Sequence, residues 1–207
     1  MKLSEYLSYF KGAETEELLR EEFGKLARHF LYGGFIKVGE DYEIYPYTVE
    51  FYFHSEEGSP YKIYDPIVYH RNNRKDSFLK TVPYFPIMTL HAHVSGFDIT
   101  FENEVLKYRA SALIRAYSIY DASAKQFLRT RNGKCVDNRS TFLYDYLNGF
   151  PLDESNHIKW VDKEWSTTQT IKSQKRKNVF LYDENEQKTK TPDERQWSFT
   201  REEEVIR

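Results

Sequence analysis

The sequence feature that most constrains the fold is the alternation of polar and apolar side chains between Tyr47 and His54. Successive side chains of a β-strand point to opposite faces, so this alternation predicts a strand with one apolar and one polar face. The two predicted faces hold Val49, Phe51 and Phe53 on one side, and Glu50, Tyr52 and His54 on the other. The sequence therefore predicts that an acid, a phenol and an imidazole project together from one strand.

Other elements are predicted on both sides of this strand. Apolar residues at helical spacing indicate an amphipathic helix that ends at the Gly33–Gly34 pair. The predicted elements are a helix at 14–33, an extended segment at 35–54, strands at 87–102 and 104–119, and a short helix at 141–147. Aromatic residues make up 17% of the chain, and they favour pleated, half-buried surfaces. The sequence is therefore expected to form mainly sheet.

Length and charge restrict the class of protein. A chain of 207 residues fits a single domain, 1–207, with a charged end at 200–207 that could be flexible. The 30 basic and 32 acidic side chains leave a net charge of −2, which excludes a strongly cationic nucleic-acid coat. The single cysteine, Cys135, excludes an internal disulfide and a four-cysteine zinc site. No apolar run reaches the roughly 20 residues of a membrane helix, and the early charges are unlike a secretory signal. We therefore expect a soluble, cytoplasmic protein with no membrane partner.

Histidines offer one possible site. Four of the six lie between residues 54 and 93. His91 and His93 are two residues apart, so on a strand both imidazoles would face the same way and could chelate a first-row metal. His70 or Asp98 would then supply a third ligand. The alternative is a polar strand face whose neutral histidines hydrogen-bond to their neighbours.

Glu50 is the carboxylate best placed for chemistry. It lies mid-strand between apolar neighbours, where a charge is costly unless it is paired or solvated from a cleft. Such a site raises the pKa of a carboxyl group toward the range of a general base. The alternative is an ordinary solvent-facing glutamate on an edge strand. No phosphate-binding or dinucleotide-binding glycine loop, G-x-S-x-G or H-E-x-x-H motif is present, and Cys135 has no base near it in sequence.

Several short segments carry a resemblance that depends on their order. Val49–His54 is similar to a V-E-x-E-A-Y strand motif, and Ala112–Ala116 is similar to a V-L-I-R-A motif. The further similar segments are Ala27–Gly33, Asp65 with His70–Arg74, Thr89–His93 with Gly96, Ser140–Gly149 and Trp197–Phe199. Taken together over residues 27–199, they resemble the alkyladenine (3-methyladenine) DNA glycosylase family.

This resemblance implies an α+β domain with a curved, mostly antiparallel β-sheet and flanking helices. It implies an enzyme that takes a modified purine from DNA, or from a related nucleoside, and hydrolyses its N-glycosidic bond with a carboxylate-activated water and no cofactor. Tyr52 occupies the position of the family's catalytic glutamate. Glu50, one pleat away on the same face, is therefore expected to activate the water.

The remaining site residues follow from the resemblance and from the basic loops at 71–75, 129–139 and 172–177. Catalysis is assigned to Glu50 and His70. The predicted substrate-binding residues are Tyr52, His54, His91, His93, Glu102 and Arg115. The predicted nucleic-acid contacts are Arg71, Arg74, Lys75, Arg131 and Lys134. Two alternatives stay open: a metal-dependent enzyme that uses His70, His91 and His93, and a non-catalytic descendant that binds nucleic acid or a protein partner.

Overall fold

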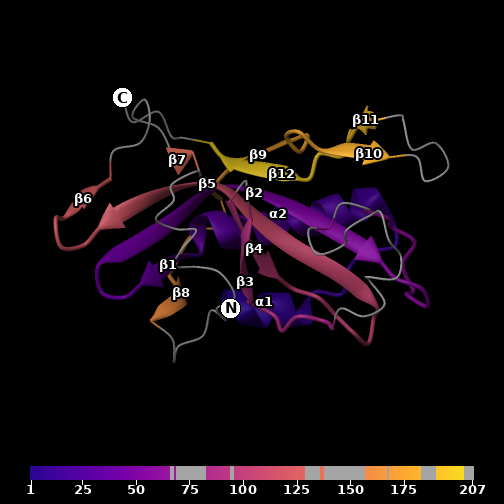
Figure 1. The fold of residues 1–207 in the computed structure, drawn as a ribbon, viewed down its shortest axis with the longest axis horizontal. Helices are drawn as coiled ribbons and strands as arrows, with labels where there is room; N and C mark the ends of the chain where they lie inside the picture. The colour runs from indigo at the N-terminus through magenta and orange to yellow at the C-terminus, as the bar shows by residue number, and fades with distance from the viewer. Residues whose placement is uncertain are drawn as a thin grey trace.

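A computed structural model gives the fold (Figure 1). It describes residues 1–65, 68, 83–93, 96–128, 136–137, 157–166, 168–182 and 190–202. The short helix expected at 141–147 lies outside these residues. The side chains of 92–93, 136–137, 182 and 190 are also outside the description.

Two helices precede the strands. Helix α1 spans Leu3–Tyr9 and α2 spans Glu16–Tyr32. The Thr15 side chain accepts a hydrogen bond from the Leu18 backbone N–H and caps α2, while acidic residues in its first turn complement the helix dipole. The helix predicted at 14–33 is thus confirmed to within two residues at its start, and Gly33 closes it as predicted.

The strands build one large antiparallel sheet and a separate hairpin. They are β1 (Gly34–Val38), β2 (Tyr42–Ser55), β3 (Leu90–His93), β4 (Gly96–Thr100), β5 (Tyr108–Asp121), β6 (Gln126–Phe127), β7 (Val136–Asp137), β8 (Ile158–Asp162), β9 (Ile171–Gln174), β10 (Phe180–Tyr182), β11 (Lys190–Pro192) and β12 (Ser198–Arg201). Among the described residues, ten of these strands form a sheet whose main order is β3-β4-β5-β2-β1-β8, and β10 pairs only with β11.

Strand β2 is the centre of the sheet. One side of β2 pairs with β5 along its length, and the other pairs first with β1 and then with β12. The register with β5 shifts between Pro46 and Val49, where β2 changes from β1 to β12 as its neighbour. Such an irregularity bends a strand and increases its twist. The sheet is consequently curled (Figure 1).

The apolar face of β2 forms the main core. Val49, Phe51 and Phe53 are fully buried as the alternation predicts. Helix α2 packs on this face, where the rings of Phe23 and Phe51 stack with centroids 4.6 Å apart. The curled antiparallel sheet with two helices confirms the predicted α+β class at this level. A fold specific to the glycosylase family stays a prediction.

Several boundaries differ from the predicted ones. The extended segment at 35–54 is a hairpin of β1 and β2, and Gly39 has the positive φ that its turn requires. The segment at 87–102 contains two paired strands, β3 and β4. Strands β6 to β12 and helix α1 were not predicted. Part of the charged end is ordered, because Thr200 and Arg201 belong to β12.

Candidate functional site

A row of directly paired residues crosses the second face of the sheet and consists of His91, Asp98, Leu113, Glu50 and Ser198. Glu50 on β2 lies opposite Leu113 on β5, and Leu113 lies opposite Asp98 on β4. On its other side Glu50 lies opposite Ser198 on β12, so β2 is not an edge strand at this point. Side chains of directly paired residues share a face. Asp98 and Glu50 therefore face the same way, with Cα atoms roughly 10 Å apart because two strand spacings separate them.

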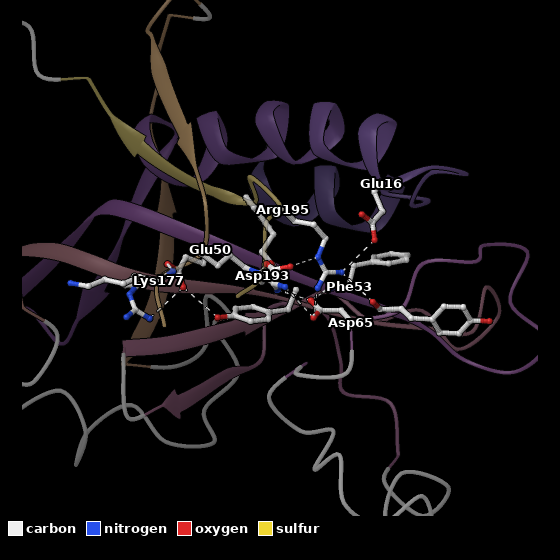
Figure 2. Close-up of polar contacts among 12 residues, drawn as sticks. Glu16, Glu50, Phe53, Asp65, Lys177, Asp193 and Arg195 are labelled. Atoms are coloured by element: carbon white, nitrogen blue, oxygen red, sulfur yellow. Dashed lines mark hydrogen bonds and ion pairs between the residues drawn. The ribbon is translucent and has the colours of Figure 1, made fainter. Parts of the chain in front are cut away.

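Glu50 lies between Leu113 and Ser198 in this row, and its side chain is only 1% exposed. Its Oε2 accepts from Arg115 Nη1 at 3.3 Å and from the Tyr52 hydroxyl at 3.3 Å. Its Oε1 accepts from the Lys177 backbone N–H at 3.1 Å, a contact drawn in Figure 2. The solvent-facing alternative considered for Glu50 is wrong, because the carboxylate is buried and held by three donors.

Burial is the largest influence on the pKa values of Glu50 and Tyr52. It raises the pKa of Glu50, although Arg115, the Lys177 N–H and Arg176 all act in the opposite direction. Burial also raises the pKa of the Tyr52 hydroxyl, and the charge of Glu50 adds to that rise. Tyr52 therefore remains a neutral hydrogen-bond donor. Of the two side chains, Glu50 is therefore the better proton acceptor.

Asp98 is a second buried acid on the same face, also 1% exposed. Its Oδ1 accepts from the Ser111 hydroxyl at 3.0 Å. Its Oδ2 has no hydrogen-bond partner among the described residues. Burial raises the pKa of Asp98 to about 7, and the charge of Glu50 contributes to the rise.

A network of buried ion pairs borders the row. Arg176 Nη1 lies 2.6 Å from Asp65 Oδ2, and Arg176 Nε lies 2.8 Å from Asp193 Oδ2. Arg195 contacts both acids from the other side. Figure 2 shows Asp65, Asp193 and Arg195 gathered beside Glu50 and Lys177. The Arg176 guanidinium also lies over the Tyr52 ring, 4.6 Å from its centroid, so this face of the ring is already occupied.

The network explains the low pKa of its central acid. Burial alone would raise the pKa of Asp65, but Arg176 and Arg195 outweigh it and hold that pKa below its usual value. Arg176 belongs to the basic loop at 172–177, which was expected to form either part of a local basic strip or a solvated face. The structure shows instead that Arg176 is buried and fully engaged with acids of the same chain.

Two of the predicted substrate-binding residues, His54 and Glu102, contact backbone N–H groups. His54 is buried, and its Nδ1 accepts from the Asp65 backbone N–H at 3.1 Å. Glu102 is buried, with Oε2 3.0 Å from Arg109 Nη1 and 2.8 Å from the Phe85 backbone N–H. Neither is among the contacts of Glu50. Tyr52 and Arg115, by contrast, both contact Glu50 directly.

The histidine cluster is only partly described. His91 lies opposite Asp98 at the end of the row, and its ring packs against Phe85 with centroids 4.5 Å apart. His70 and the side chain of His93 lie outside the described residues, as do all five predicted nucleic-acid contacts: Arg71, Arg74, Lys75, Arg131 and Lys134. Within the described part of the chain, no group of three or more potential ligands could hold a metal ion.

The shared sheet face of Asp98 and Glu50 was not predicted, because Asp98 was considered only as a metal ligand. The signal was present in the alternation of Gly96–Thr100, where Asp98 stands between apolar Phe97 and Ile99 in the same way that Glu50 stands between Val49 and Phe51. Strand order, which places β4 two strands from β2, is not visible in that local pattern.

Comparisons with known proteins give no match, whether with family models, with curated protein sequences or with solved structures. The glycosylase resemblance therefore rests on the short motifs alone. Among the helices described, none is long and apolar enough to cross a membrane.

Proposed function

We propose that this protein hydrolyses the N-glycosidic bond of a modified purine, in DNA or in a related nucleoside, with Glu50 as the group that activates water. The observation that supports it most is the environment of Glu50. A carboxylate that is 1% exposed, with a raised pKa and with Tyr52 and Arg115 on one oxygen, is typical of a positioned general base.

Hydrolysis of an N-glycosidic bond needs few catalytic groups besides this carboxylate. Departure of a purine leaves an oxocarbenium-like sugar, which a nearby carboxylate stabilises, and water then completes the substitution at C1′. Glu50 would accept the proton of that water. Arg115 and the Tyr52 hydroxyl would hold the carboxylate in place, and the exposed part of Arg115 would be available to a phosphate of the substrate.

The experiment is base release from duplex oligonucleotides and from nucleosides that carry hypoxanthine, ethenoadenine or a methylated purine. We expect the wild-type protein to release at least one of these bases. Glu50→Gln removes the base function while keeping the side-chain shape, so release should fall about 100-fold or more. Glu57→Gln, the same change at an exposed glutamate, should leave release unchanged.

Two results would count against the proposal. If Glu50→Gln releases base as fast as the wild type, Glu50 is not the general base. If the wild type releases no base from any of the substrates, the protein is not a purine glycosylase. Circular dichroism of each variant keeps loss of folding separate from loss of chemistry.

Binding without catalysis is a second candidate, and one observation favours it. Both oxygens of Glu50 already accept hydrogen bonds from the protein itself, an arrangement equally suited to a structural role. Fluorescence titration with single-stranded and duplex oligonucleotides at two salt concentrations tests this candidate. Binding that weakens with salt, combined with no base release, would support it, whereas absence of binding at both salt concentrations would remove nucleic acid as the ligand.

A further inference from the structure

We infer that the sheet carries a binding surface for single-stranded nucleic acid outside the site around Glu50. The surface is built on four aromatic residues, called here the aromatic cluster: Phe35 on β1, Tyr45 on β2, Tyr120 on β5 and Phe127 on β6. Tyr45 and Glu50 lie on the same strand, and roughly 15 Å of extended chain separates them. The inference therefore goes beyond the proposed glycosidic activity and does not depend on it.

The rings of the aromatic cluster contact one another across the strands. Their centroids are 5.0 Å apart for Phe35 and Tyr45, 6.1 Å for Tyr45 and Phe127, and 5.2 Å for Tyr120 and Phe127. None of the four belongs to the main apolar core. Phe127 is 58% exposed, and the other three side chains are half-buried. A patch of rings that stays partly open to solvent in this way is typical of a binding site.

Two lysines beside the cluster face each other on neighbouring strands. Lys159 on β8 lies directly opposite Lys37 on β1, and like charges in that position destabilise a sheet. Lys37 forms an ion pair with Glu40 at 2.5 Å, whereas Lys159 has no ion pair within the described residues. The positive charge of Lys159 is therefore left without a carboxylate beside it.

A third lysine adjoins the rings directly. Lys163 Nζ lies 5.5 Å from the centroid of the Tyr45 ring and has no ion pair among the side chains that the structure describes. Burial and the nearby charge of Arg201 both lower the pKa of Lys163. Glu43 is an acid next to these rings, and it accepts a hydrogen bond from the Tyr45 hydroxyl. A bound anion would thus offset positive charge that the protein itself leaves uncompensated at Lys159 and Lys163.

Rings and cations on one surface match a ligand that carries planar and anionic groups together. Single-stranded nucleic acid has both, because its bases stack on aromatic side chains while its phosphates contact lysines. The bases of a duplex are already stacked and paired, so their faces are closed to protein rings. An acidic peptide would compensate the lysines but leave the rings unused. The combination therefore favours a single strand, of DNA or of RNA.

The first experiment is fluorescence anisotropy of the wild-type protein with four labelled oligonucleotides of equal length. These are oligo-dT, oligo-U, a DNA duplex, and an abasic strand that keeps the phosphates and lacks the bases. We expect oligo-dT or oligo-U to bind at least about 10-fold more tightly than the abasic strand, since stacking on the rings contributes to affinity only when bases are present. Whichever of oligo-dT and oligo-U binds more tightly identifies the source of the strand.

Two variants test the residues. Phe127→Ala removes the most exposed ring of the cluster and should weaken binding of the preferred strand about 10-fold or more. Phe180→Ala, the matched change at a ring that is 40% exposed on the separate β10–β11 hairpin, should leave binding unchanged. Lys163→Ala should reduce the slope of log affinity against log salt by about 0.7, as loss of one phosphate contact does. Lys11→Ala, the same change at an exposed lysine before α2, should leave that slope unchanged.

Several results would overturn the inference. They are absence of binding to both single strands at low salt, binding of the abasic strand or the duplex as tight as that of oligo-dT and oligo-U, and equal effects of Phe127→Ala and Phe180→Ala. Equally tight binding of poly-glutamate would indicate a surface for acidic peptides instead. The comparison of oligonucleotides uses the wild-type protein alone, so it decides the question even if a variant fails to fold.

Discussion

At the scale of single residues, the ion pair of Arg176 with Asp65 is the interaction whose loss should destabilise the fold most. Both side chains are completely buried, and each has further charged partners. Removing one member of such a pair leaves an uncompensated charge in a medium that solvates it poorly.

Arg176→Met is accordingly expected to lower the free energy of unfolding by about 3–5 kcal/mol. Urea denaturation followed by circular dichroism measures the loss. The control is Lys25→Ala, which breaks the exposed pair of Lys25 with Glu22 and should cost no more than about 0.5 kcal/mol. Similar losses for the two variants would show that the buried network contributes little to stability.

Sequence reasoning located one residue of this network and missed the rest. Asp65 was recognised in a family-like segment, but Arg176 was assigned to an exposed basic cluster. Its partners Asp65 and Asp193 lie 111 and 17 residues away along the chain. The density of charge along a sequence reveals solvated clusters well, but it carries no information on pairing across such separations.

At the scale of elements, the predictions succeeded where periodicity was strong. The helix and the two faces of β2 follow from spacing alone, because burial of one side of a regular element imprints its period on the sequence. No periodic pattern in the sequence indicates the change of partner strand at Pro46–Val49. Strand β12, which borders Glu50, and its neighbour β9 are four residues each and too short for a reliable period.

Two glycines, one inside α2 and one at the start of β1, should change the free energy of unfolding in opposite directions when each is replaced by alanine. A Cβ at Gly24, inside α2, would meet only the Phe199 ring at an ordinary 3.7 Å, so Gly24→Ala should raise the free energy of unfolding by about 0.5–1 kcal/mol. A Cβ at Gly34 would clash with the Val161 carbonyl oxygen and would lie 2.7 Å from the Trp160 ring.

Gly34→Ala should therefore destabilise the protein by more than 1 kcal/mol, because β1 and β8 would have to separate. Thermal unfolding of the two variants beside the wild type measures both changes. A destabilised Gly24→Ala, or a neutral Gly34→Ala, would contradict the close packing described here.

At the scale of the whole molecule, the two kinds of buried acid give stability opposite dependences on pH. The pKa of Asp98 is raised from 3.8 to about 7, so the folded state binds a proton that the unfolded chain has lost. Its contribution to stability is therefore greatest below pH 4 and declines as pH rises to about 7. Asp65, whose pKa is lowered, stabilises the fold above pH 4 and loses this effect as pH falls.

Between pH 4 and pH 7 we expect the free energy of unfolding of the wild type to fall, with Asp98 contributing on the order of 2–4 kcal/mol of that decline. Glu50 contributes in the same direction, since its pKa is also raised. In Asp98→Asn the decline should be much smaller. Urea denaturation at half-unit steps of pH measures the slopes, and parallel slopes for the two proteins would contradict the buried, protonated state of Asp98.

The position of β12 has a consequence for the order in which the site can form during synthesis. Glu50 is made before its neighbours Lys177 and Ser198, which follow it by 127 and 148 residues. A ribosome-bound chain that has reached residue 170 can pair β2 with β5 while the Glu50 carboxylate still lacks β12 and the Lys177 N–H. The carboxylate then stays hydrated until translation of these late segments encloses it, so the emerging chain can pair β2 with β5 before the surroundings of Glu50 are complete.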